Sequence, residues 1–359
     1  MPKVAVIILT WNGIRYLPDC LGNLIKQDYE KVNREFIVVD NASTDGAAEY
    51  VKTNFPEFSL IENDKNYGFD KGNNIGMKYA LDKGYDYIVL LNQDTAVDPS
   101  WLSELVNVAE SDKKIGGAQS LMLYWDERDI INSIGNQLHF LGFGFCEGNR
   151  KKLEIGPSNT AGKNCKLEII SDITYASSSA VLYRANVLKE VGCFDEEFFL
   201  YHEDTDLSFK IKMAGYRVVL APKSIMYHNY EFSRSIKKYY YMERNRYRIL
   251  LTYFKLPTLI LIFPAFIAME GGMWLFAFKG GWTREKLRAY GYILSPKNLA
   301  DIYKKHRRVM ETRKLSDKEF TKNFVGEIMY QEIDNPLLRY IANPMFRVYW
   351  ALVWRIIWW

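Results

Sequence analysis

The stretch Tyr87-Ile88-Val89-Leu90-Leu91-Asn92-Gln93-Asp94-Thr95 decides the fold. Its first five residues are apolar or aromatic, which predicts a strand that is buried on both faces. The run then ends abruptly in Asn92, Gln93 and Asp94. Ligands of open α/β sheets bind beyond the carboxyl ends of the strands, and a carboxylate there can hold a hard divalent cation against a phosphate. An acidic turn that leads into a helix near Trp101 is the structural alternative.

Three similar units precede this strand. Apolar runs at residues 3–9, 35–39 and 58–62 predict buried strands, and each is followed by a polar turn and a helical stretch. The predicted helices end near residues 27, 54 and 83. Ser43 or Thr44 is the expected N-cap of the second helix. Strand and helix alternate throughout. The sequence therefore predicts an α/β fold with a doubly wound, mostly parallel sheet.

All four predicted strands end in polar clusters, which are Thr10 with Asn12, Asp40 with Asn41, the run 66–74, and Asn92 with Asp94. Because parallel strands place their carboxyl ends on one edge, we expect these clusters to form a nucleotide crevice, in which Asp40 binds ribose hydroxyls or a base N–H. Glycines in the run 66–76 would let the backbone approach a ligand closely. A GxGxxG fingerprint is absent from the first turn, which argues against a nicotinamide enzyme.

A second acidic cluster lies at residues 192–207, GCFDEEFFLYHEDTDL, and a helix is expected to begin at Asp204 or Thr205. Such acids can simply stabilise the start of a helix, by a favourable interaction with its dipole or as caps. However, partial desolvation by Phe199 and Tyr201 would raise the basicity of a carboxylate to that of a general base. His228, at the end of another predicted strand, is either a buried hydrogen-bonded residue or a metal ligand.

Charge is distributed unevenly along the 359 residues. Residues 1–233 carry a net charge of −9, and residues 234–322 a net charge of +13. Such asymmetry indicates an anionic partner for the second segment, either nucleic acid or a lipid surface. The four cysteines have no CxxC spacing, and the first ten residues are strand-like and unlike a secretory signal. We therefore expect a reducing compartment and cysteines without a catalytic role.

Five motifs together resemble one known family. They are TWN at 10–12, VDNASTDG at 39–46, NYGFDKGNNIG at 66–76, LLNQD at 90–94 and GCFDEEFFLYHEDTDL at 192–207. In combination they resemble the inverting glycosyltransferases of family 2, which have the GT-A fold, and within them the rhamnosyltransferase-like branch. The resemblance covers about residues 1–255.

This resemblance implies roles for individual residues. Asp94 would be the metal-binding acid of the family's DxD element, His228 a further metal ligand, and Asp204 the catalytic base, supported by Glu203 and Asp206. The cofactor would be Mg²⁺ or Mn²⁺. The residues expected along the nucleotide sugar are Thr10, Asn12, Asp40, Asn41, Asn66, Gly68, Gly72, Asn73, Asn92 and Gln93. One departure is that Asn92 replaces the first acid of DxD, which leaves one strong protein carboxylate for the cation.

After residue 233 the sequence changes character. Residues 237–241 and 244–248 interleave basic and aromatic side chains on a predicted helix. This pattern suits RNA, and it equally suits an anionic lipid surface or a diphosphate-bearing substrate. The acids at 195–206 would repel a polyanion, which argues against a nucleic-acid partner.

Residues 256–278 form a largely apolar stretch that is long enough to span a bilayer. Pro257, Pro264, Glu270 and the pair Gly271–Gly272 interrupt it. A buried pair of core helices, a single span and a broken hairpin at the membrane interface are all compatible with this pattern. We favour the hairpin because Glu270 would be costly on a lipid-exposed helix.

The last fifteen residues, 345–359, combine Trp and Arg as interfacial helices do, although packing against the protein's own core is the alternative. With the basic helical stretch at 284–322, they predict a peripheral, monotopic enzyme on the cytoplasmic face of the membrane that binds anionic lipids. We expect a catalytic domain at 1–232, with a nucleotide-sugar half at 1–125 and an acceptor half at 126–232, and a helical region at 233–359.

The sequence thus favours an inverting, metal-dependent transferase that moves a sugar, rhamnose from dTDP-rhamnose, to a glycan on a polyprenyl diphosphate in cell-envelope polysaccharide synthesis. One alternative is the same fold acting with a UDP-sugar on a protein or soluble glycan. Another is a non-catalytic nucleotide-binding or RNA-binding protein.

Overall fold

A computed structural model of the chain describes residues 1–153, 169–229, 235–329 and 336–359. These residues form two compact units. The first contains Met1–Asn136, Cys146–Phe199 and Tyr216–Glu231, and the second contains Gln137–Phe145, Leu200–Gly215 and Phe232–Trp359. Cys20 is a buried free thiol, and Cys165 lies outside the described residues.

Alternating strands and helices build the first unit. Its elements are β1 (Val4–Thr10), α1 (Leu17–Ile25), a 3₁₀ turn (Lys31–Asn33), β2 (Arg34–Asp40), α2 (Ala47–Asn54), β3 (Ser59–Glu62), α3 (Gly68–Lys83), β4 (Tyr87–Asn92), β5 (Thr95–Val97), α4 (Trp101–Ser111), β6 (Ile115–Tyr124), β7 (Ile131–Ser133), β10 (Ser171–Asp172), β11 (Ala180–Arg184), α5 (Ala185–Val191) and β12 (Arg217–His228). Two further strands, β8 (Asn136–Leu138) and β9 (Gly144–Cys146), pair with each other where the chain passes between the units.

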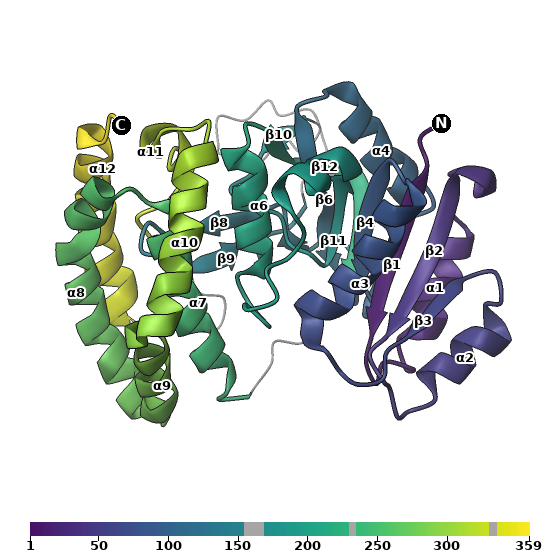
Figure 1. Cartoon of the computed structure of the whole chain (residues 1–359), viewed down its shortest axis with the longest axis horizontal. Helices are drawn as coiled ribbons and strands as arrows, with labels where there is room; N and C mark the ends of the chain where they lie inside the picture. The colour runs from purple at the N-terminus through teal and green to yellow at the C-terminus, as the bar shows by residue number, and fades with distance from the viewer. Residues whose placement is uncertain (154–168, 230–234, 330–335) are drawn as a thin grey trace. The chain divides into compact units, whose positions relative to one another are not determined.

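The main sheet has the strand order β10-β12-β6-β11-β4-β1-β2-β3 (Figure 1). Strands β4, β1, β2 and β3 pair in parallel, as the sequence predicts. Strand β11 then enters antiparallel between β4 and β6, so the sheet as a whole is mixed. The α/β architecture is therefore confirmed, with antiparallel pairing beyond the first four strands.

Apolar side chains cover both faces of this sheet. On one face, Val6 and Val89 pack in a core with residues of α1, α2 and α4. On the other face α3 lies close to β1. A Cβ on Gly76 of α3 would stand only 2.6 Å from the side chain of Ile7. Burial on both faces follows from the continuous apolar runs of β1, β2 and β4.

Two details concern the sequence-based expectations. The N-cap of α2 is Gly46 and not Ser43 or Thr44. The strand expected to end at His228 is β12, whose register with β6 shifts between Ala221 and Ile225. Helix boundaries agree more closely, since the helix that was expected to begin at Asp204 or Thr205 begins one residue earlier, at Glu203.

The second unit is helical. Its helices are α6 (Glu203–Met213), α7 (Lys238–Tyr253), α8 (Leu256–Lys279), α9 (Thr283–Leu294), α10 (Pro296–Thr312), α11 (Asp317–Phe320), a π-helical turn (Leu338–Ala342) and α12 (Asn343–Ile356). In Figure 1 the green and yellow helices α8, α9, α10 and α12 gather together. Helix α12 packs through the ring of Trp350, which stacks on Phe140 at a centroid distance of 4.9 Å.

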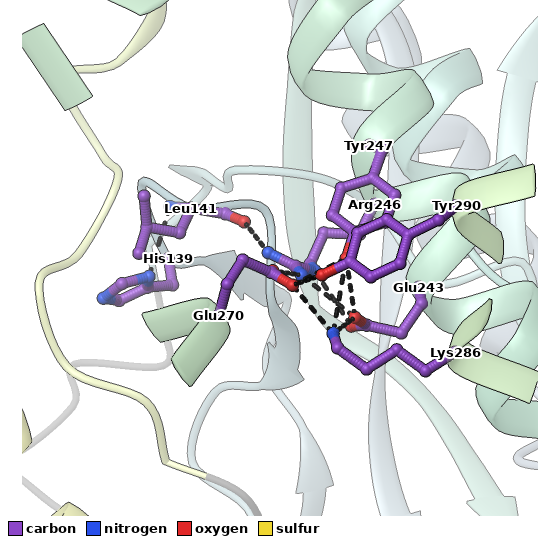
Figure 2. Close-up of polar contacts among 8 residues, drawn as sticks. All are labelled: His139, Leu141, Glu243, Arg246, Tyr247, Glu270, Lys286 and Tyr290. Carbon is purple, nitrogen blue, oxygen red and sulfur yellow. Dashed lines mark hydrogen bonds and ion pairs between the residues drawn. The ribbon is translucent and has the colours of Figure 1, made fainter. Parts of the chain in front are cut away.

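The hairpin predicted for residues 256–278 is wrong, because α8 is one continuous helix of 24 residues that contains Pro264. Glu270 does not face lipid. It is buried, and it contacts Arg246 of α7 and Lys286 of α9, whose Nζ lies 2.8 Å from Oε2 (Figure 2). Because Arg246 and Lys286 neutralise this carboxylate inside the protein, the helix can continue through Glu270 without exposing a charge to lipid.

The basic residues of α7 are likewise buried. Arg244, Arg246 and Arg248 are each at most 5% exposed. Arg246 and Lys286 bind Glu243, and although burial opposes the effect, these cations lower the pKa of Glu243. The residues 244–248 therefore form internal contacts, and the expectation that they face RNA or a lipid surface is wrong.

The ion cluster of Figure 2 gives a stability prediction. Lys286→Met removes a fully buried cation and leaves Glu243 and Glu270 with Arg246 as their remaining cationic partner. Because an uncompensated buried charge is costly, we expect the free energy of unfolding to fall by about 3–5 kcal/mol. Urea denaturation at pH 7 measures it. Arg307→Met, at the exposed ion pair with Glu311, is the control and should change little. Equal effects of the two variants would contradict the prediction.

Candidate active site

The parallel register aligns the polar ends of three strands. Thr10 lies level with Asp40 of β2, and Leu9 with Asn92 of β4. Asn41 follows directly and is held by a hydrogen bond from its N–H to the carbonyl of Thr10, at 2.8 Å. Three of the clusters that the sequence places in one crevice therefore do meet at one edge of the sheet.

The first turn is fixed from both sides. Thr10 Oγ1 donates to Oε1 of Gln93 at 2.6 Å, and Asn12 Oδ1 accepts from the N–H of Thr44 at 2.8 Å. Asn12 has a left-handed backbone, with φ of 49°. A Cβ on Gly13 would lie 1.9 Å from Gln93 Oε1, so a side chain there would displace the amide of Gln93. Gln93 and Asn12 thus shape the turn through their side chains.

The carboxylate of Asp40 is buried, and one of its two oxygens has a hydrogen-bond donor. Its side chain is 3% exposed, and Oδ2 accepts a hydrogen bond from the N–H of Ser43 at 3.0 Å. Oδ1 is also buried, yet it accepts no hydrogen bond from any residue that the structure describes. Buried polar atoms are nearly always satisfied. This oxygen can accept a hydrogen bond from a water or from an N–H or O–H of a ligand.

Asn41 and Asn66 organise the third turn. The amide of Asn41 donates to the carbonyl of Gly68 at 2.9 Å and to Oδ1 of Asn66 at 3.3 Å. Its own oxygen accepts from Asn63 at 2.8 Å. Asn66 Oδ1 also accepts from the N–H of Gly68 at 2.8 Å, and Gly68 has φ of 82°. The side chain of Asn41 therefore holds the loop that leads into α3.

Gly72 and Asn73 lie on the buried side of α3. A Cβ on Gly72 would stand 2.6 Å from a methyl group of Leu9, so this glycine allows α3 to pack against β1. Asn73 is buried, and its amide donates to the carbonyl of Phe69 at 3.0 Å. The close approach that the sequence suggested for the glycines is, at Gly72, an approach of helix to strand.

Asp94 and His228 face each other although 134 positions separate them. Strand β5 pairs antiparallel with β12 and sets Thr95 opposite His228. His228 Nε2 consequently lies 3.6 Å from Oδ1 of Asp94, whose side chain is 26% exposed. His228 Nδ1 is 3.1 Å from Oδ1 of Asn132. With Nδ1–H donating to that oxygen, Nε2 presents its lone pair towards Asp94, as in a metal-ligating histidine.

A cleft of about 220 Å³ opens beside Asp94. It is lined by Arg15, Tyr16, Asp19, Asp94, Thr95, Trp125 and Asn229. Among the described residues there is no group of three or more His, Cys, Asp or Glu side chains that could hold a metal ion. Asp94 and His228 offer two donors, so a cation here would need further ligands such as phosphate oxygens.

Sequence reasoning did not find Arg15 or Asn132. Arg15 follows the first turn and lines the cleft beside Asp94, where its guanidinium suits a diphosphate. Its only signal was its position five residues after a strand end. Asn132 belongs to β7, and the pairing of β7 with β6 brings it to His228.

Asp204, in the second unit, lies in the first turn of α6. It is half-buried, and its Oδ1 accepts from the N–H of Thr205 at 2.7 Å. Burial raises the pKa of Asp204 to about 7, although the hydrogen bonds from Thr205 oppose the rise. A carboxyl with this pKa is poised to accept a proton near neutral pH.

The acids beside Asp204 differ from it. Asp206 is buried and is already engaged, with Oδ2 2.8 Å from Nζ of Lys210 and Oδ1 accepting from Tyr253 at 2.7 Å. Glu203 is also buried. Of the three acids, Asp204 is the most accessible and therefore the one best able to exchange a proton with a substrate.

The residues just before α6 are strained. Tyr201 and His202 are consecutive and both left-handed, with φ of 64° and 68°. Each such residue costs about 1–2 kcal/mol, and this conformation sets the direction in which α6 begins. Non-glycine residues in this region often mark functional sites.

Comparisons with known proteins identify the family of this chain. A protein of Mycobacterium tuberculosis named N-acetylglucosaminyl-diphospho-decaprenol L-rhamnosyltransferase is 26% identical over 239 residues, which cover 62% of this chain and 75% of that protein. GalNAc-T7, solved with UDP, GalNAc and Mn²⁺, superimposes with a TM-score of 0.54 at 17% identity; the match covers 71% of this chain and 49% of GalNAc-T7.

A second solved structure is similar over most of its length. The mannosyltransferase PcManGT of Pyrobaculum calidifontis, in complex with GDP-Man and Mn²⁺, has a TM-score of 0.52 and 15% identity, with 87% of this chain and 86% of that chain covered. Residues 5–192 match Glycosyl transferase family 2, and residues 158–356 match Glycosyl transferase family group 2. The chain belongs to glycosyl transferase family 2 and is a glycosyltransferase.

Proposed function

We propose that this glycosyltransferase moves rhamnose from dTDP-rhamnose to a glycan on a polyprenyl diphosphate, with inversion at the anomeric carbon. The observation that carries the proposal is the pair Asp94–His228, set 3.6 Å apart at the sheet edge where the strand ends converge. The named activity of the mycobacterial relative supports rhamnose and a lipid-linked acceptor.

The residues present fit a divalent cation. Asp94 supplies a carboxylate oxygen and His228 an imidazole nitrogen oriented by Asn132. Both solved relatives hold Mn²⁺. When bound, such a cation would neutralise the charge that develops on the departing diphosphate. Because the chain offers two ligands here, we expect the donor's phosphate oxygens to complete the site.

The donor's other end is assigned to the neighbouring strand ends. Asp40 Oδ1 would accept from the base N–H or a ribose hydroxyl of the nucleoside, which would satisfy this buried oxygen. Arg15 would bind the diphosphate from the cleft beside Asp94. Thr10, Gln93 and Asn12 keep the turn between these two groups in place.

Asp204 is proposed as the general base. The acceptor oxygen attacks the anomeric carbon as the bond from that carbon to the diphosphate oxygen breaks. The proton of the acceptor hydroxyl moves to the carboxylate of Asp204, and the nucleoside diphosphate leaves. A single displacement from the opposite face inverts the configuration, so one carboxylate suffices and no carboxylate nucleophile is needed.

A donor screen tests this function. The protein is incubated with dTDP-rhamnose, UDP-N-acetylglucosamine, UDP-galactose or GDP-mannose and a prenyl-diphosphate-linked N-acetylglucosamine, with and without Mn²⁺. We expect transfer from dTDP-rhamnose that requires the cation, and loss of most transfer in Asp94→Asn, because one of two metal ligands is weakened. Transfer from a UDP-sugar alone would replace rhamnose by the second donor class, and undiminished transfer after removal of the cation would refute the metal site.

The base assignment predicts a pH profile. Asp204 acts only when deprotonated, and burial raises its pKa to about 7. The value of kcat/KM should therefore fall about tenfold per pH unit below about pH 7, whereas an ordinary aspartate would keep kcat/KM constant down to about pH 4.

The substitution Asp204→Asn tests the same assignment. It should retain donor affinity and lose most turnover. A variant that keeps more than about a tenth of the wild-type rate would show that Asp204 is not the base.

The proposed acceptor is linked to a lipid, so we expect the enzyme to bind a membrane. The helical unit has exposed apolar side chains that could make this contact. Helix α8 is long and apolar enough to cross a membrane by length and composition. Its side chains Leu256, Ile260, Phe263 and Ile267 are all more than half exposed. Helix α12 exposes a similar stripe formed by Met345, Val348, Leu352 and Ile356. Apolar stripes on two helices of one unit favour contact with lipid.

Cations accompany these stripes. Helix α10 exposes Lys304, Arg307 and Arg308 in the same unit. Exposed basic residues of this kind are attracted to anionic lipid headgroups. We therefore propose peripheral binding at the cytoplasmic face of the membrane, where nucleotide sugars and prenyl-linked acceptors meet.

Flotation with liposomes of phosphatidylglycerol and phosphatidylethanolamine tests the membrane proposal. The wild-type protein should float with the vesicles. The double variant Val348→Glu, Leu352→Glu should remain in the soluble fraction, because each change places a charge on the apolar stripe of α12. The double variant Thr53→Glu, Asn54→Glu, at exposed positions of α2 in the first unit, is the control and should still float. A wild-type protein that stays soluble without detergent and does not float would contradict the proposal.

A further inference from the structure

The start of α6 depends on contacts made by the segment just before it. Tyr201 and His202 have left-handed backbones, and Glu203 is the first helical residue. Such a conformation persists only where the surroundings over-determine it. Whatever fixes these residues also fixes the direction of the first turn of α6, which bears Asp204.

Asn245 of α7 makes those contacts. Its amide nitrogen donates to the carbonyl of Leu200 at 2.9 Å and to the carbonyl of Tyr201 at 2.8 Å. Asn245 is fully buried. Nε of Arg244 donates to Oδ1 of Asn245 at 2.8 Å, so the orientation of the amide is fixed with its N–H groups towards both carbonyls.

Tyr253, further along α7, contacts Asp206, which follows Asp204 in the first turn of α6. Its hydroxyl lies 2.7 Å from Oδ1 and 3.0 Å from the carbonyl oxygen of Asp206. Tyr253 is 1% exposed. One helix thus binds the chain both before and after Asp204, through two buried side chains.

Helix α7 is itself firmly held. Arg246, next to Asn245, binds Glu243 and Glu270 and donates to the carbonyl of Leu141 at 3.2 Å (Figure 2). Lys286 Nζ lies 2.7 Å from Oε2 of Glu243 and 2.8 Å from Oε2 of Glu270. Figure 2 shows these charged ends converging from α7, α8 and α9 on one point. This anchoring fixes α7 at the turn that carries Asn245.

We propose that α7 sets the position of Asp204, with Asn245 as the positioning residue before it and Tyr253 as the one after it. The inference rests on the proposed function, because it takes Asp204 to be the base. Neither side chain touches the reacting atoms. They act through the backbone at 200–201 and through Asp206, and they hold the carboxylate of Asp204 in the orientation that proton transfer requires.

Asn245→Asp tests the proposal with an isosteric change. It replaces the amide that donates to two carbonyls by a group that repels both, and it leaves the volume unchanged. Because misplacement of a reacting group by about 1 Å costs on the order of 100-fold, we expect kcat to fall by roughly that factor. The KM for dTDP-rhamnose, and the affinity for dTDP with Mn²⁺ by calorimetry, should change less than about twofold, because the donor-binding residues are untouched.

Asn343→Asp is the matched control. Asn343 lies in the same unit, and its amide donates to the carbonyl of Ile328 at 3.0 Å, so the variant loses the same kind of hydrogen bond away from α6. Both variants should lower the unfolding temperature, whereas only Asn245→Asp should lower kcat. An Asn245→Asp enzyme that keeps more than half of its kcat, or a control that loses as much, would overturn the proposal.

Hydrogen–deuterium exchange separates this proposal from the base assignment. In the protein without substrate, amides of residues 203–207 should exchange faster in Asn245→Asp and unchanged in Asn343→Asp. If Asp204→Asn stays active while this exchange rises in Asn245→Asp, the base assignment fails and the positioning of the helix start stands.

Tyr253→Phe is the second variant, for the case that Asn245→Asp does not fold, because it removes one hydroxyl alone. It is expected to lower kcat at constant donor KM, and an unchanged kcat together with unchanged exchange would refute the proposal.

Discussion

The register of three parallel strands is the constraint on which the sheet edge depends. Thr10 is level with Asp40, and Leu9 with Asn92. A slip by one residue would turn every side chain of a strand to the opposite face. Close packing opposes such a slip, because Ile7 and Leu9 of β1 fit against the glycines of α3. Because of this register, the turn at Thr10, the buried oxygen of Asp40 and the loop before Asp94 come together. Hydrogen bonds such as the one from Thr10 Oγ1 to Gln93 Oε1 then join their sequence motifs.

The strand-end part of the site was predictable because each strand end is marked by a short stretch of sequence. Each strand ends where an apolar run meets polar residues, and parallel pairing places those ends on one edge. The contact between Asp94 and His228 was not predictable from such patterns. It depends on the antiparallel pairing of β5 with β12, which joins positions far apart in sequence. Asn132 was missed for the same reason, since its role exists only once β7 lies beside β6.

The helical unit shows the limit of reading charge from sequence. The same residues, Arg244 to Arg248, suit an exposed cationic surface and a buried ion cluster equally well. What decides between them is the presence of Glu243, Glu270 and their neighbours on α7 and α8. One of these acids was in fact visible as an anomaly, because Glu270 interrupts an apolar helix. In this chain the lone carboxylate of an apolar helix indicates buried cationic partners, Arg246 and Lys286, and not a break in the helix.

The two acids proposed for catalysis need opposite environments. Asp94 must attract a cation, and its partly exposed side chain beside an open cleft keeps the carboxylate accessible to ion and phosphate. Asp204 must take a proton near neutral pH, which requires desolvation, and burial raises its pKa to about 7. Burial alone would leave such a group free to turn away from a substrate. The strained residues before α6 and the buried side chains of α7 give it a fixed direction as well, so basicity and orientation come from separate parts of the second unit's packing.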